Sequence, residues 1–199
     1  MSLATSQWIN FLVKNEEGYK NLLYLSSLSH TSDNNPVGIN FRDLNNYSEG
    51  LICYIGGEYN PLLFLNNQNK ESLIHEYISS FKKLYLDNLL FEIQRINDSK
   101  IDSFEKKFLK YAYENKISVI GTNNIKFEKL NDYNAHDALL CIAQKSTINQ
   151  TNRLLSNQNL YFKSSDEMIE IFNDIPDIIE NNFNIAKKFN FFPKEKSPK

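Results

Sequence analysis

Short apolar runs alternate with longer segments of helical period along this chain, and that alternation limits the fold more than any other feature. The runs are rich in Ile, Leu, Val or Phe and are bounded by Gly, Asn or Asp, which is typical of β-strands. Their nearly continuous apolar character favours strands that are buried on both faces of a parallel sheet. The predicted strands are residues 9–13, 51–55, 89–94 and 118–121, with a shorter candidate at 160–163.

Amphipathic helices are predicted between and after these strands, because apolar residues recur there at spacings of three and four. We expect Asp102 to be the N-cap of one of them. Segment 132–144 is apolar almost all round, which predicts a helix enclosed by the rest of the protein. The predicted helices are 15–29, 69–86, 102–115 and 132–144, followed by one from Ser165 and one opening at Pro176.

Strand–helix alternation of this kind predicts an α/β fold with mostly parallel strands joined by right-handed crossovers. A length of 199 residues suits a single domain. Four or five strands are too few to close an ordinary β/α barrel. The sheet is therefore expected to be open, or to be part of a barrel whose other strands are missing.

Charge and cysteine content exclude several classes of protein. The formal net charge of −2 does not favour a surface that coats nucleic acid, because such domains usually carry an excess of Lys and Arg. Cys53 and Cys141 each stand alone in an apolar run, so we expect two reduced, buried thiols rather than a zinc site. No apolar stretch is long enough to span a membrane, and a cytoplasmic location is expected.

In a parallel α/β protein the chemistry lies where the strands end. The segments that follow the second, third and fourth strands are 56–58, 95–98 and 122–126, and they contain no histidine and no convincing pair of carboxylates. The Gly56-Gly57 pair is interpreted as a turn with positive φ rather than a phosphate loop, since no GK[ST] follows. His136 is expected to hydrogen-bond a neighbouring loop, because its neighbour Asp137 faces another direction on the helix.

Several segments, taken in order, resemble one family: the PHP (polymerase and histidinol phosphatase) domain of bacterial replicative DNA polymerase III alpha subunits. The resemblance covers about residues 8–192, and six segments in the family's order make it specific. The segments are KNEEGYKNLL from Lys14, YSEGLI from Tyr47, GTNN from Gly121, AHDALLCI from Ala135, YFKSSDEM from Tyr161 and the run from Ile175 to Lys188.

The resemblance implies a distorted β/α barrel of about seven strands, of which this chain carries an incomplete part with extra C-terminal helices. The strands that open the family's barrel, and its His-x-Asp type motif, are expected to precede this chain. The polymerase active site, which requires Mg²⁺, is expected to follow it. On this interpretation residues 1–3 are an added leader, residues 4–192 are a partial PHP domain and residues 193–199 are a polar tail that leads toward the polymerase core.

The family's metal-binding positions fall on residues that do not suit a metal. A cysteine expected after the second strand falls at Gly57, or in a gap if Gly-Gly-Glu is aligned instead. A histidine expected after the third strand falls at Ile96. The Asp and His of a Thr-Asn-Asp-x-His signature fall at Asn124 and Lys126. Isoleucine has no donor atom, and a lysine ammonium repels a cation. The resemblance therefore predicts a degenerate site with no catalytic, cofactor-binding or metal-binding residues.

The favoured hypothesis is a structural module of the replicase that docks the separate proofreading exonuclease subunit within the polymerase III holoenzyme, with DNA held by other domains. The alternative is a metal-dependent phosphoesterase or exonuclease with unusual ligands, for which the candidates are Glu58, Glu92 and Asp98. Direct DNA binding by this chain is disfavoured by its balanced charge. Missing strands leave a sheet edge exposed, so self-association of the chain is also predicted.

Overall fold

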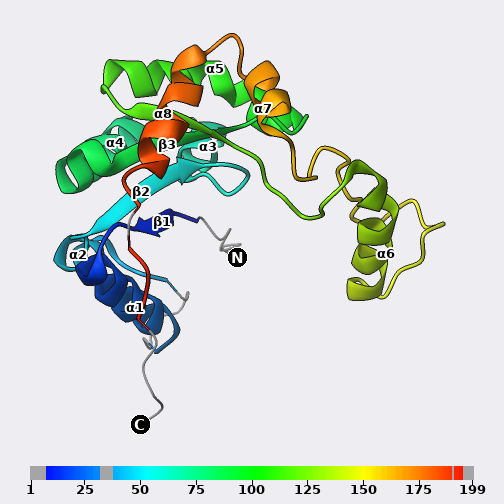
Figure 1. Ribbon diagram of the computed structural model, residues 1–199, viewed down its shortest axis with the longest axis horizontal. Coiled ribbons are helices and arrows are strands. Elements are labelled where there is room, and N and C mark those ends of the chain that lie inside the picture. The colour runs from blue at the N-terminus through cyan, green and yellow to red at the C-terminus, as the bar shows by residue number, and fades with distance from the viewer. Residues whose placement is uncertain (1–7, 32–37, 190, 195–199) are drawn as a thin grey trace.

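A computed structural model describes residues 8–31, 38–189 and 191–194, and its centre is one open four-stranded sheet (Figure 1). The strands lie side by side in chain order. β2, β3 and β4 are parallel, and their register pairs Ile55 with Phe91 and Phe91 with Val119. The predicted α/β class with mostly parallel strands is therefore confirmed. The strands are β1 (Asn10–Val13), β2 (Leu51–Gly56), β3 (Leu89–Gln94) and β4 (Ser118–Thr122).

Parallel pairing is wrong for β1, which runs antiparallel to β2. The end of β1 lies beside the start of β2, where the Lys14 amide donates to the Gly50 carbonyl at 2.9 Å. Gly18 packs so closely on Gly50 that an added Cβ would lie 2.0 Å from the Gly50 oxygen. This contact between two glycines fixes the path that the chain takes from β1 back to β2. Hydrophobic periodicity carries no information about strand direction, so it could not predict the antiparallel pairing of β1.

Within the described ranges, seven α-helices pack around or beside the sheet, and an eighth, α6, extends away from it (Figure 1). α3, α4 and α5 cover one face, while α8 runs along the outer strand β4. The short helices α2 and α3 were not predicted, because six or seven residues give too little periodicity. The helices are α1 (Glu16–Thr31), α2 (Phe41–Asn46), α3 (Pro61–Asn67), α4 (Glu71–Tyr85), α5 (Ser99–Glu114), α6 (Tyr133–Ala143), α7 (Ser165–Ile171) and α8 (Pro176–Ala186).

The main core lies between the sheet and the helices on its covered face. Phe91 of β3 is fully buried and stacks on Phe108 of α5, with ring centroids 4.4 Å apart. Phe172 and Ile178 complete this core from the C-terminal helices. Ile52, Leu90 and Ile120 point to the other face, where Ile185 and Phe189 pack against them. Cys53 and Cys141 are free, buried thiols, as predicted.

The predicted start of one helix and one predicted strand are wrong. The N-cap of α5 is Asp98, whose side chain accepts hydrogen bonds from the amides of Lys100 and Ile101, so the helix begins one turn before the predicted cap Asp102. Segment 160–163 forms a single parallel bridge, between Phe127 and Tyr161, instead of a strand. Both errors arise because a polar cap or an isolated bridge leaves no hydrophobic periodicity in the sequence.

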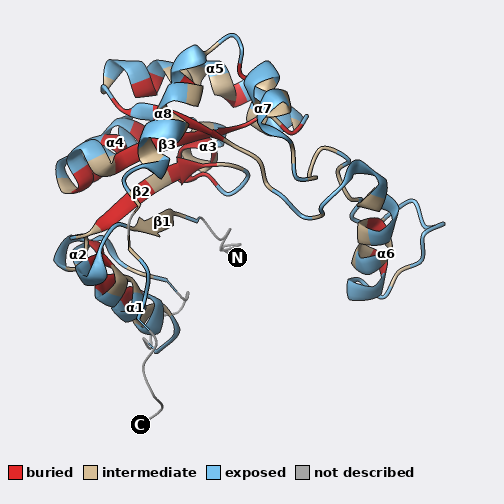
Figure 2. Cartoon of the chain, viewed as in Figure 1, coloured by how far each residue is buried: buried red, intermediate tan, exposed pale blue. Residues whose placement is uncertain are grey.

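The prediction that segment 132–144 is enclosed is also wrong. Its helix, α6, belongs to an arm, residues 128–160, that stands away from the sheet (Figure 2). Leu139 is 62% exposed and Ile142 is 74% exposed. The arm holds itself together through Asp137, whose carboxylate accepts two hydrogen bonds from Arg153 at 2.8 and 2.7 Å. An apolar sequence shows that a helix can be buried, and only the neighbouring elements decide whether it is.

Some predictions concern residues that lie outside the described part of the chain. The predicted leader, residues 1–3, is one of them, and residues 195–199 of the predicted polar tail are another. Within the described residues, no helix has the length and apolar character needed to cross a membrane.

Candidate functional site

A pocket of about 360 Å³ opens where β2, β3 and β4 end, on the face of the sheet opposite the main core. Its position is the one that chemistry usually occupies in parallel α/β proteins. Three aromatic side chains, those of Trp8, Tyr54 and Tyr59, also contribute to it. The polar side chains that line the pocket are those of Asn10, Glu58, Glu92, Gln94, Thr122, Asn123, Asn124 and Lys126.

The structure brings most of the predicted site residues together in this pocket. Gly57, Asn124 and Lys126, three of the four degenerate family positions, line it. Glu58 and Glu92, two of the three alternative metal ligands, line it as well. Residues from three segments far apart in sequence therefore meet at one place, because the carboxyl ends of parallel strands share one edge of the sheet.

Two predicted site residues lie outside the pocket. The Ile96 side chain is buried, and its carbonyl oxygen accepts a hydrogen bond from the Asn157 side chain at 2.8 Å. Asp98 is engaged as the N-cap of α5. The structure therefore does not place Asp98 with Glu58 and Glu92, and the alternative ligand set is not brought together.

Glu92 is the central ionisable group of the pocket, with only 6% of its surface exposed. Its Oε1 accepts a hydrogen bond from the Thr122 hydroxyl at 2.5 Å and another from the Gln94 amide at 3.2 Å. Burial raises the pKa of Glu92 above its usual value, and these two hydrogen bonds oppose that rise. The carboxylate is held in one orientation by its neighbours within the sheet.

Gln94 and Thr122 are site residues that were not singled out from the sequence. Glu92 and Gln94 are two residues apart on β3, so their side chains point to the same face of the sheet. Thr122, on the neighbouring strand β4, is the register partner of Gln94. The Gln94 amide also donates to the Thr122 hydroxyl at 3.2 Å. Period-two alternation of polar residues at the end of β3 is a signal that could have identified Gln94.

The two adjacent glycines permit this close packing. Gly57 has a φ of +69°, as predicted for the turn, and an added Cβ there would meet the Gln94 amide at 3.1 Å. Gly56 belongs to β2, and an added Cβ there would lie 2.1 Å from the Glu92 carbonyl oxygen. Larger residues at these positions would displace β3 and the carboxylate of Glu92.

An aromatic pair stands at one side of the pocket. Trp8 and Tyr59 stack with ring centroids 5.0 Å apart, and about half of each side chain is exposed. The Tyr54 pKa is raised, first by burial and second by the negative charge of Glu92. Lys126 lies exposed at the rim.

The donor set of the pocket does not fit a divalent metal centre of the kind that the family resemblance implies. Among residues 8–31, 38–189 and 191–194, no group of three or more His, Cys, Asp or Glu side chains is placed to hold a metal ion. Glu92 is already hydrogen-bonded, and Lys126 contributes a positive charge. Metal sites in proteins normally require several anionic or imidazole ligands that converge on one point.

The three histidines all lie away from the pocket. His136 Nδ1 is 2.6 Å from the Ser156 hydroxyl, which confirms the predicted contact with a neighbouring loop. His75 is exposed on α4, 3.8 Å from Glu71. His30 lies in the last turn of α1.

Comparison with known proteins bears on the family of the chain. Residues 4–96 match the PHP domain family. The chain is 36% identical over 188 residues to the DNA polymerase III subunit alpha of Rickettsia bellii, a match covering 92% of the chain and 16% of the relative. The corresponding figures for Borreliella burgdorferi are 36% over 191 residues, covering 91% and 16%. For Caulobacter vibrioides they are 29% over 198 residues, covering 98% and 17%.

The matched relatives are much longer than this chain, which spans about 16% of their length. The match nevertheless covers nearly all of the chain, and the predicted resemblance is confirmed. The chain carries a PHP domain and corresponds to a segment of DNA polymerase III alpha subunits.

Proposed function

We propose that this chain is a structural PHP region of a cytoplasmic replicative DNA polymerase, which supports the polymerase and docks its proofreading exonuclease without hydrolysing phosphoesters itself. DNA synthesis with Mg²⁺, DNA binding and contact with the other holoenzyme subunits belong to the longer protein in this proposal. In this proposal the open sheet is an incomplete part of the distorted β/α barrel of the PHP family. The observation that carries the proposal is the pocket at the strand ends, in which Asn124 and Lys126 stand beside a hydrogen-bonded Glu92.

The chemistry of that pocket supports a structural role. Thr122 and Gln94 satisfy the same oxygen of Glu92 and so connect the ends of β3 and β4. The ammonium group of Lys126 opposes the binding of a second cation, and neutral Asn124 supplies no charge to offset it. In this proposal the side chains that meet at the strand ends link β3 to β4 and do not hold an exchangeable metal.

Docking is tested by titrating the 199-residue chain with the proofreading exonuclease subunit of the same organism in a calorimeter. We expect a saturable 1:1 complex with a dissociation constant in the micromolar range or below. An unrelated α/β domain of similar size and charge is the control. The docking part of the proposal fails if no heat is detected at micromolar concentrations while the chain unfolds cooperatively.

The structural part is tested separately by elemental analysis of the purified chain. We expect far less than one zinc or manganese ion per chain. The double variant Asn124→Asp with Lys126→His restores two family-type ligands and serves as the matched comparison, since it is expected to retain more metal than the unmodified chain. Stoichiometric metal in the unmodified chain would contradict the proposal even if docking is observed.

A metal-dependent phosphoesterase is the second candidate, and the observation that favours it is that Glu58 and Glu92 line one pocket. It predicts hydrolysis of bis-p-nitrophenyl phosphate with added Mn²⁺, and loss of that hydrolysis in Glu92→Gln. We expect no hydrolysis above that of a protein-free control.

The proposal includes self-association, in which copies of this chain meet at the outer edge of β1. The outward backbone groups of Ile9, Phe11 and Val13 have no hydrogen-bond partner among the described residues. Unpaired strand edges recruit further strands. Light scattering is expected to give a mass above that of the monomer at high concentration.

A further inference from the structure

β4 is the outer strand of the sheet on the side opposite β1, and no strand among the described residues pairs with its outer edge. Edge strands present unpaired N–H and C=O groups that invite pairing with another chain. The backbone groups of Val119 and Gly121 face away from β3 and toward α8. These backbone groups therefore need hydrogen-bond partners other than β3.

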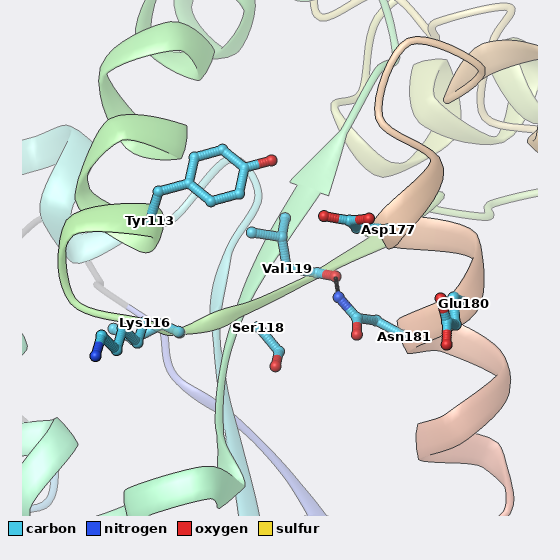
Figure 3. Close-up of a pocket in the computed structure, with 8 residues that line it drawn as sticks. Tyr113, Lys116, Ser118, Val119, Asp177, Glu180 and Asn181 are labelled. Atoms are coloured by element: carbon cyan, nitrogen blue, oxygen red, sulfur yellow. Dashed lines mark hydrogen bonds between the residues drawn. The ribbon is translucent and has the colours of Figure 1, made fainter.

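Two asparagine side chains of α8 bond to them. The Asn182 carboxamide accepts from the Gly121 amide at 3.1 Å and donates to the Gly121 carbonyl at 2.8 Å. The Asn181 carboxamide donates to the Val119 carbonyl at 2.9 Å, as the dashed line in Figure 3 shows. A carboxamide carries one acceptor and a donor group, like a peptide unit. Asn182 therefore makes the two bonds that a residue of a fifth strand would make.

A small residue on β4 allows α8 to come close enough for these bonds. An added Cβ at Gly121 would lie 2.6 Å from the Phe172 ring and 2.7 Å from the Ile178 side chain. Both of those side chains are fully buried in the main core. The packing of Phe172 and Ile178 on Gly121 thus positions α8, and Asn181 and Asn182 follow on its next turn.

We propose that Asn181 and Asn182 close the β4 edge, in place of a fifth strand, against addition of the same strand from a second copy of this chain. A second copy presents the same edge, and two identical edges pair about a two-fold axis without any further segment. Closing β4 leaves β1 as the edge at which the chain self-associates. This inference rests on the β4–α8 contacts and is independent of the exonuclease-docking proposal.

The test combines amide hydrogen exchange at Gly121 with the mass of the chain in solution. Asn182→Leu keeps the side-chain size and removes both hydrogen bonds, and the double variant with Asn181→Leu removes all three. We expect exchange of the Gly121 amide to become about tenfold faster or more, and the mass measured by light scattering to rise above that of the unmodified chain at equal concentration. Asn184→Leu, an exposed position on the same helix, is the matched control and should change neither quantity.

The variant Asn182→Asp distinguishes protection of the β4 edge from the packing of α8 on β4. Its carboxylate can still accept from the Gly121 amide but cannot donate to the Gly121 carbonyl. A charge at a strand edge itself opposes pairing, so the mass of this variant should stay that of the unmodified chain. Unchanged Gly121 exchange in the Leu variants would overturn the proposal, and so would faster exchange without a rise in mass. If those variants fail to fold, the unmodified chain decides, because a Gly121 amide that exchanges as fast as an exposed loop amide contradicts the closure.

Discussion

Phe91 and Glu92 are neighbours in β3 and both are buried, yet they point to opposite faces of the sheet. Phe91 lies in the helix-covered core against Phe108. Glu92 lies in the pocket, where two hydrogen bonds hold a carboxylate whose pKa is raised by burial. One face therefore gains stability from burial, while the other pays a desolvation cost to keep a charged group in place.

This comparison shows that burial alone does not identify a residue's role. An apolar ring in a packed core needs no explanation beyond stability. A carboxylate kept at the end of a parallel strand, at a cost to stability, indicates a site with a specific role, here the joining of β3 and β4. Substitutions on the two faces should therefore change the free energy of unfolding in opposite directions.

The largest effect is expected on the helix-covered face. Phe91→Ala removes a fully buried ring and leaves a cavity beside Phe108, so the free energy of unfolding should fall by about 3–5 kcal/mol. Urea denaturation followed by circular dichroism measures this. A loss below about 1 kcal/mol would show that the main core does not lie where the structure places it.

A smaller loss is expected where the same face meets the C-terminal helices. Gly121→Ala adds a methyl group 2.6 Å from Phe172 and 2.7 Å from Ile178, and the resulting shift of these side chains should cost about 1–3 kcal/mol of unfolding free energy. Thermal or urea unfolding detects it. Gly38→Ala is the control, since no atom lies within 4 Å of an added Cβ at that position.

On the pocket face, a substitution is expected to raise the free energy of unfolding instead of lowering it. Because the pKa of Glu92 is higher in the folded than in the unfolded chain, folding stability falls as the pH rises from about 4.3 through the raised folded pKa. Glu92→Gln carries no charge and can still accept the Thr122 hydroxyl. At pH 7 this variant should therefore be more stable than the unmodified chain, by less than Gly121→Ala costs.

The same variant should lose its advantage at low pH. Well below a pH of about 4.3 the Glu92 carboxyl is protonated in both the folded and the unfolded chain, so the difference between the two unfolding midpoints should shrink toward zero. Urea midpoints measured from about pH 3 to pH 8 test this. An advantage for Glu92→Gln that does not depend on pH would mean that desolvation of the charge is not its cause.

The smallest effect is expected in the α6 arm, which neither face covers. Ile142 is 74% exposed, so Ile142→Ser should change the free energy of unfolding by no more than about 0.5 kcal/mol. Differential scanning calorimetry is sufficient to measure it. A loss comparable to that of Phe91→Ala would mean that the arm is packed in solution against a surface of the same or another chain.

Much of the fold was predictable because its signals are local. The runs that form β2, β3 and β4 and the stripes that form α4 and α5 were identified from hydrophobic periodicity. The location of Gly57, Asn124 and Lys126 at one site also followed, since parallel strands end together. The direction of β1, the cap at Asp98 and the short helices α2 and α3 depend on single contacts that leave no such periodicity.

The sequence by itself determined the four strands of the sheet and the longer helices, that β2, β3 and β4 are parallel, and which family the chain resembles, because these follow from residue type and spacing along one chain. Only the tertiary structure decided that α6 is exposed, that Gln94 and Thr122 hold Glu92, and that Asn182 bonds to the outer edge of β4. Each of these depends on which side chains from distant segments meet in space, and the identity of a residue does not specify its partners.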